Sequence, residues 1–99
     1  MRRAIVRQCA QMFDVPAQDI LSHSRRGHLT LPRFAVYKAL RMRGRSWSEI
    51  GRIMYRDRKT IAYGIRRAEW HMARDANYAA KVITLALTMP FYPWVSPKA

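Results

Sequence analysis

Apolar residues recur every three or four positions in successive segments of this chain, and this spacing is what most restricts its fold. The first such stripe consists of Ile5, Cys9, Met12 and Phe13. That period is typical of a helix with one buried side, whereas a half-buried strand needs an apolar residue at every second position. Four or five helices fit the sequence and strands do not, so the expected fold class is all-α.

Prolines divide the first half of this pattern. The first helix is expected to end at residues 14–16, Asp-Val-Pro, because the residue before a proline is pushed out of the helical region. A short turn over residues 18–21 leads into a polar and cationic loop over residues 22–28. Pro32 suits the first turn of a second helix, which we expect to end near residues 42–44.

Capping residues divide the second half. The S-x-x-E spacing of residues 46–49 is that of a capping box and opens a short third helix. The side chains of this helix expected to point inward are Trp47, Ile50 and Met54. Asp57 offers an N-cap to a long fourth helix. The inner stripe of that helix is Ile61, Ile65, Ala68 and Met72. A break at residues 75–77 precedes a fifth helix over residues 78–88.

Positive charge is concentrated in the middle of the chain. Lys and Arg number 19 against 6 Asp and Glu, a formal net charge of +13. Residues 25–67 hold 13 basic residues against Glu49 and Asp57, so this stretch carries 13 − 2 = +11 of the total. Because 49% of the residues are hydrophobic, the charge lies on a folded body. Such a chain favours a polyanion as partner, nucleic acid first and an anionic membrane second.

The fourth helix carries cations on its outer face. Opposite its apolar stripe lie Arg58, Lys59, Ala62, Tyr63 and Arg66. Arg58 and Lys59 in the first turn oppose the helix dipole, which costs a few tenths of a kcal/mol each unless an external anion offsets it. Residues 55–57 alone join this helix to the short one before it. A short helix, a tight turn and a longer basic helix predict a helix-turn-helix, whose second helix enters the major groove of DNA.

Several motifs in the same order resemble one known family. They are Ile20-Leu21-Ser22-His23-Ser24-Arg25-Arg26, Leu31-Pro32-Arg33, Glu49-Ile50-Gly51-Arg52 and Arg56-Asp57-Arg58-Lys59-Thr60-Ile61. Over residues 2–87 the chain resembles the C-terminal DNA-binding domain (domain IV) of the bacterial replication initiator DnaA. The G-x-x-x-x-G-K-[ST] loop of an ATPase does not occur in the sequence. The resemblance therefore implies a free-standing domain without the initiator's ATPase domain.

The resemblance also implies roles for single residues. The helix that begins at Asp57 would lie in the major groove, and Arg56 and Asp57 would contact bases or phosphates. Arg33 would reach into the adjacent minor groove. Arg25 and Arg26 of the loop would hold phosphates, together with backbone groups at helix starts.

The chain departs from the family in two places. Its His-Thr pair is replaced by Arg58-Lys59, and one residue is missing from the glycine-rich turn before Arg56. Because Arg and Lys suit guanine O6 and N7 rather than thymine methyl groups, we expect a different, more G-containing DNA site. The complete set of expected DNA-binding residues is Arg25, Arg26, Arg33, Arg56, Asp57, Arg58, Lys59, Thr60, Tyr63, Arg66 and Arg67.

Some of these residues also fit roles that do not involve DNA. Arg33 can be a solvated residue at the start of a helix. Tyr63 can stack on a base, contact a phosphate or only cover its helix. Trp47 is expected in the core rather than on a base.

No catalytic, cofactor or metal site is expected. The six acidic residues are scattered, whereas a nuclease needs clustered carboxylates to hold its metal ions. Cys9 is the single cysteine and is expected to be a small core residue. His23 and His28 flank the basic loop without further metal ligands nearby. We therefore expect a protein that is not an enzyme and takes no small-molecule substrate.

Two functions from different classes fit these features. The first is a sequence-specific binder of double-stranded DNA that acts as a transcriptional regulator. The second is an interaction or antagonist protein that occupies initiator-type sites, or touches the replication or transcription machinery, with DNA binding secondary. A module for RNA or an anionic membrane is a weaker third hypothesis, because the first and fifth helices lack a strongly basic amphipathic face.

Two regions are expected: a helix-turn-helix domain over residues 1–88 and a tail rich in proline and aromatic residues over 89–99. The tail either packs on the domain or docks a protein partner. The longest apolar run, residues 82–87, is too short to span a membrane, and the start of the chain does not form a signal peptide. A cytoplasmic, nucleoid-associated protein is therefore expected, as a monomer or a dimer.

Overall fold

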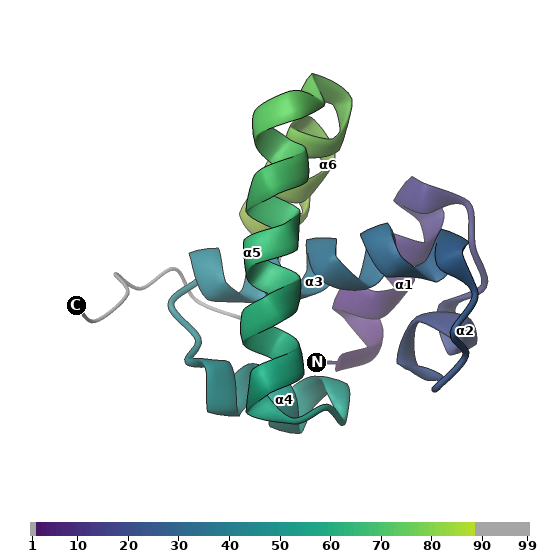
Figure 1. Ribbon diagram of the computed structural model, residues 1–99. Helices are drawn as coiled ribbons and strands as arrows, with labels where there is room; N and C mark the ends of the chain where they lie inside the picture. The colour runs from purple at the N-terminus through teal and green to yellow at the C-terminus, as the bar shows by residue number, and fades with distance from the viewer. Residues whose placement is uncertain (1, 89–99) are drawn as a thin grey trace.

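Helices account for the fold of residues 2–88, the part of the chain that the computed structural model describes (Figure 1). They are α1 (Arg2–Phe13), α2 (Ala17–Leu21), α3 (Thr30–Met42), α4 (Trp47–Met54), α5 (Arg58–Arg74) and α6 (Ala76–Leu87), with one 3₁₀ turn, η1 (Gly27–Leu29), before α3. Residues 2–88 contain no strand, and the all-α prediction is confirmed. Both hypotheses about the tail concern residues 89–99, which lie outside the described part.

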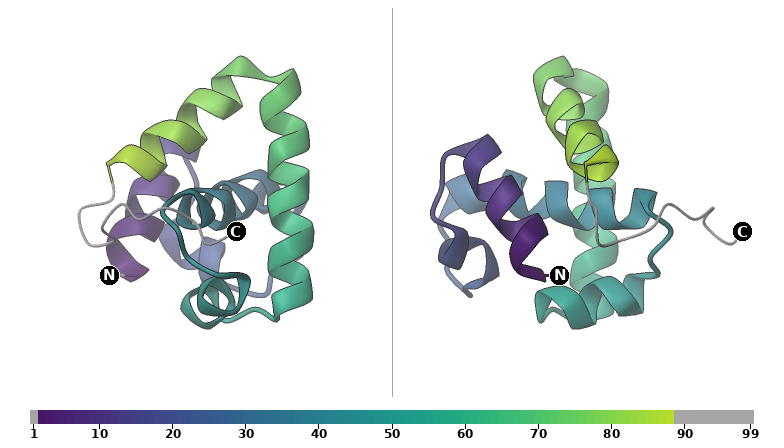
Figure 2. Two further views of the ribbon diagram at one scale, coloured as in Figure 1. Left: turned by 90° about the vertical axis from the view of Figure 1, so that its left-hand side faces the viewer. Right: turned by 180° about the vertical axis from the view of Figure 1, so that it is seen from behind.

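α3 is the central helix of the domain. α5 crosses it at a steep angle, α4 lies at the N-terminal end of α5, and α6 runs back from the other end of α5 (Figures 1 and 2). The main core joins Val36 and Leu40 of α3 to Ile5 of α1 and Ile61 of α5, all at most 2% exposed. α3 thus holds the α4–α5 pair on one side and α1 on the other.

The crossing of α3 and α5 depends on a glycine. A Cβ atom placed on Gly64 would lie 2.6 Å from the ring of Tyr37 and 2.9 Å from that of Phe34. Real side chains do not approach this closely, so only glycine lets the two helices meet at this point. The contact fixes how α5 projects from the body of the domain.

The helix boundaries differ from the sequence-based expectation in two places. Residues 17–21, expected as a turn, form the short helix α2, so the described chain has one helix more than the five predicted at most. The predicted break at residues 75–77 is confined to Asp75. Its carboxylate accepts from the backbone N–H of Asn77 (3.0 Å) and Tyr78 (3.1 Å), and this cap lets α6 begin at Ala76.

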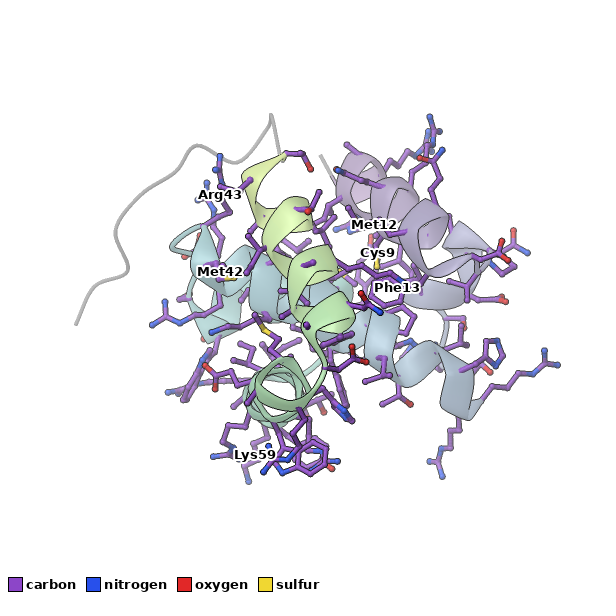
Figure 3. All side chains as sticks on the ribbon, turned by 90° about the horizontal axis from the view of Figure 1, so that it is seen from above. Cys9, Met12, Phe13, Met42, Arg43 and Lys59 are labelled. Carbon is purple, nitrogen blue, oxygen red and sulfur yellow. The ribbon has the colours of Figure 1, made fainter. Side chains whose placement is uncertain are left out.

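Cys9 is buried in the core, as predicted (Figure 3). Its Sγ lies 3.3 Å from the carbonyl oxygen of Pro32, and burial raises the pKa of the thiol to about 12. Among residues 2–88, no three or more His, Cys, Asp or Glu side chains are grouped closely enough to hold a metal ion. Nor is any helix of this part both long and apolar enough to cross a membrane.

Candidate nucleic-acid interface

α4 begins with the predicted capping box. The Ser46 hydroxyl accepts from the backbone N–H of Glu49 (3.1 Å), and the Glu49 carboxylate accepts from the backbone N–H of Ser46 (3.1 Å). The bond from the Ser46 backbone lowers the pKa of Glu49. Since the backbone N–H groups of Ser46 and Glu49 both have acceptors, this eight-residue helix has a defined start despite its short length.

The turn between α4 and α5 is tight at two positions. Tyr55 ends α4 in the left-handed region with φ of 57°. The Arg56 N–H donates to the Gly51 carbonyl (2.9 Å), and a Cβ atom on Gly51 would lie only 2.5 Å from the Arg56 carbonyl oxygen. Gly51 therefore permits the close packing of the turn against α4 that a helix-turn-helix requires.

Asp57 caps α5, as predicted. Its carboxylate accepts from the backbone N–H of Thr60 at 2.7 Å. This hydrogen-bonded contact with Thr60 lowers the pKa of Asp57. The cap sets the first turn of the helix and so fixes the backbone positions from which the Arg58 and Lys59 side chains project.

The first two turns of α5 present an exposed and mostly cationic face. Lys59 projects from the side of α5 that faces away from α1 and α3 (Figure 3). The predicted contact residues on α5 that are exposed are Arg58, Lys59, Thr60, Tyr63 and Arg66, while Arg67 is half-buried. Of the outer face that the periodicity predicted, Arg58, Lys59, Tyr63 and Arg66 are exposed and Ala62 is half-buried.

Two surface hollows flank Arg58. One, of about 350 Å³, is lined by Ser48, Gly51, Arg52, Tyr55, Arg56 and Arg58. The other, of about 580 Å³, is lined by Trp47, Asp57, Arg58, Lys59 and Ala62. Both open beside the start of α5, and both carry cationic side chains on their walls. Their cationic side chains are of the kind that contacts phosphates in protein–DNA complexes.

The prediction that Trp47 lies in the core is wrong. Its side chain is 39% exposed, and the Arg58 guanidinium carbon lies 5.5 Å from the centre of its ring. Ile50 and Met54, predicted to point the same way, are buried. Trp47 is the first residue of α4 and lies beyond the edge of the core, so its ring borders the first turn of α5 instead.

A chain of serine contacts shapes the basic loop. The Ser22 hydroxyl donates to the Asp19 carbonyl (2.8 Å) and accepts from the Ser24 N–H (3.2 Å). The Ser24 hydroxyl in turn accepts from the Arg26 N–H (3.4 Å). The loop is thereby folded, and Arg25 and Arg26 are exposed on its outside.

Arg33 holds this loop from within. Its Nε donates to the Ile20 carbonyl (2.9 Å) and its Nη1 to that of Ser24 (2.7 Å). Its Nη2 donates to the carbonyls of Asp19 (2.7 Å) and Ser22 (2.8 Å). The guanidinium is thus directed at the protein backbone. It is not the solvated helix-start residue of the plainer hypothesis.

Arg56 joins the loop to the helix-turn-helix, a role that sequence reasoning missed. Its Nη1 donates to the Tyr55 carbonyl (3.0 Å), and its Nη2 donates to the Ser22 carbonyl. Burial lowers the pKa of Arg33, and the nearby Arg56 charge lowers it further. Backbone carbonyls as acceptors leave no pattern in a sequence, so only the structure shows this pairing.

The sequence is similar to known proteins. Residues 3–68 match the helix-turn-helix family of bacterial DnaA proteins, which is two thirds of the chain. Over 75 residues the chain is 32% identical to the chromosomal replication initiator protein DnaA of Desulfotalea psychrophila. That match covers 75% of this chain and 16% of the initiator, so the chain spans only a small part of that relative's length. The chain belongs to the bacterial DnaA helix-turn-helix family of DNA-binding domains.

Proposed function

We propose that this chain is a sequence-specific reader of double-stranded DNA that acts as a transcriptional regulator on the nucleoid. The observation that carries the proposal is the start of α5. There the Asp57 cap fixes two exposed cations, Arg58, which lines two open hollows, and Lys59, which lines one of them. A helix N-terminus with exposed side chains of this kind is what enters a major groove in helix-turn-helix proteins.

Base recognition is assigned to the first turn of α5. Arg58 and Lys59 carry donors that match the O6 and N7 acceptors of guanine. Thr60 completes this first turn. Tyr63 and the cations Arg66 and Arg67 lie farther along the helix, toward the sugar–phosphate backbone at the edge of the groove. The preferred site therefore contains guanine at the positions that face the two leading cations.

Phosphate binding is assigned to the basic loop. Arg25 and Arg26 are exposed on a loop that Arg33 and Arg56 hold in shape from behind. Contacts to phosphates supply affinity without sequence preference. The minor-groove contact predicted for Arg33 stays a prediction, and it requires the guanidinium to give up some of its present carbonyl partners.

Selection of binding sites from a random pool of duplexes tests the proposal. We expect short selected sites that contain guanine, bound about 10³-fold more tightly than random duplex. With six to eight phosphate contacts, log K should fall with log salt at a slope of about −5 to −7. Equal affinity for selected and random duplex would contradict sequence-specific reading.

The same selection separates regulation from antagonism. Membership of the DnaA family favours, as a second candidate, a protein that occupies the initiator's own sites. In that case the selected sites would compete with an intact initiator in a mixed binding assay. Selected sites that an initiator does not bind would support an independent regulator.

A further inference from the structure

The exposed face of α5 continues beyond the residues assigned to the groove. Along one line of the helix, the exposed side chains are Lys59, Tyr63, Arg66, Trp70 and Arg74. Cationic and aromatic residues alternate on this line. Trp70 is 44% exposed, and tryptophan and arginine are both enriched at the centres of interfaces. The second half of this face has no role in base reading.

Trp70 holds two arginines in place. The guanidinium carbon of Arg74 lies 3.9 Å from the centre of the indole ring, and that of Arg67 lies 4.8 Å from it. Arg74 Nη1 also donates to the Trp70 carbonyl (2.9 Å). Stacking on a ring reduces the freedom of long side chains, so less entropy is lost when the arginines bind an anion.

The two adjacent acids, Glu69 and Asp75, are both engaged elsewhere. Glu69 directs its carboxylate to Lys38 of α3, with Nζ 2.8 Å from Oε2. This ion pair turns the negative charge toward the body of the domain. The Asp75 carboxylate accepts from the backbone N–H groups of Asn77 and Tyr78 at the start of α6. The positive field of Arg67 and Arg74 is therefore available to an anion outside the protein.

The position of Trp70 along α5 indicates which anion its two arginines bind. Trp70 comes twelve residues after Arg58, which is about 18 Å along the axis at 1.5 Å per residue. The major groove is only about 12 Å wide. A helix that reads bases with its first turn and crosses the groove therefore passes the groove edge between Arg66 and Trp70, where the sugar–phosphate backbone lies.

We propose that Arg67, Trp70 and Arg74 bind the phosphodiester backbone that flanks the base-read site. The inference rests on the proposed function, because it uses the placement of the start of α5 in the groove. Continuity with the cationic face of the first turns favours DNA as the occupant. An acidic segment of a partner protein is the alternative that the test separates.

Two duplexes with the same selected site test this proposal. One is trimmed to the base-read positions, and the other is extended by about half a helical turn of DNA at each end. The wild-type protein should bind the longer duplex about tenfold more tightly, with a steeper salt dependence. Trp70→Ala and Arg74→Ala should lose this gain and bind the trimmed duplex as the wild type does. Arg74→Ala should also reduce the salt slope on the longer duplex by about 1.

Lys81→Ala is the matched control. Lys81 also lies over an aromatic ring, with Nζ 4.9 Å from the centre of Phe13, but it belongs to α6. Its loss removes one charge elsewhere and should keep the gain from the longer duplex. Circular dichroism checks that each variant is folded, and Trp70→Phe, which keeps a ring for the arginines, should retain most of the gain.

The outcomes separate this inference from the function on which it rests. Trp70→Ala and Arg74→Ala could keep the full gain in affinity for the longer duplex while Arg58→Ala still loses base preference. In that case the proposed phosphate contacts of Arg67, Trp70 and Arg74 are wrong, and sequence-specific DNA binding by α5 is still supported. If the wild type prefers no duplex sequence at all, the proposed function itself fails.

Discussion

Arg33 and Arg56 donate hydrogen bonds to the same atom, the carbonyl oxygen of Ser22. Arg33 belongs to the first turns of α3, and Arg56 lies in the turn before α5. One carbonyl of the basic loop thus joins the two parts of the proposed interface. Like charges this close repel, and the added carbonyl acceptors around Arg33 offset that cost.

Arg33→Lys is expected to destabilise the domain. A single ammonium group cannot span the carbonyls that the planar guanidinium reaches, so we expect the free energy of unfolding to fall by about 2 kcal/mol. Urea denaturation measures this change. Affinity for all duplex sequences should fall with it, because the loop loses its shape. Unchanged stability, with a loss of affinity only at A·T-rich sites, would instead place Arg33 in the minor groove.

Arg58 and Arg25 are expected to contribute differently to DNA binding. Arg58→Ala should relax base preference and cost about 1–3 kcal/mol on the preferred site, since it removes donors that face bases. Arg25→Ala should weaken all sequences alike. Titrations of both variants against selected and random duplex compare the two effects. A uniform loss in both variants would show that the start of α5 is not in the groove.

Gly51→Ala is expected to disturb the turn that positions α5. The new Cβ would lie 2.5 Å from a backbone carbonyl of Arg56, which cannot move without shifting the turn. We expect a loss of about 1–3 kcal/mol in the free energy of unfolding, with weaker binding of the selected site. Gly27→Ala is the control, because nothing lies within 4 Å of its Cβ position. Equal stability of the two variants would contradict the close packing at Gly51.

The Asp57 cap is expected to make the stability of the domain depend on pH. Its pKa in the folded protein is below the ordinary value of 3.8, so the cap stabilises fully above that value. This stabilisation is lost as the pH falls through the lowered pKa. Asp57→Asn should cap without that dependence, and the difference in stability between it and the wild type should shrink from pH 6 toward pH 2. A constant difference across this range would contradict the prediction.

Local patterns explain which features could be predicted from the sequence. The capping box at Ser46, the cap at Asp57 and the buried stripe of α5 each depend on residues within a few positions of one another. The cationic face of α5 follows from the same helical period. Trp70 and Arg74, at i and i+4, form a local pattern of the same kind.

Other features depend on how distant segments pack, and these could not be predicted. Arg56 and Ser22 are separated by 34 positions, and backbone carbonyls as acceptors carry no sequence signal. Trp47 has the spacing of a core residue, yet the core ends before it reaches the first position of α4. Burial at the edge of a domain depends on what packs there, and periodicity does not contain that information.

Tyr55 is expected to strain the turn that it forms. It is the C-cap of α4 with φ of 57°, a region that costs residues with a side chain about 1 kcal/mol or more and glycine almost nothing. Its ring is 57% exposed and lies under the Arg2 guanidinium, whose carbon is 4.2 Å from the ring centre. Tyr55→Gly and Tyr55→Ala both remove this contact, so comparing them isolates the backbone. We expect the glycine variant to be about 1 kcal/mol more stable in urea denaturation. Equal stability of the two variants would mean that this residue does not hold the left-handed conformation in solution.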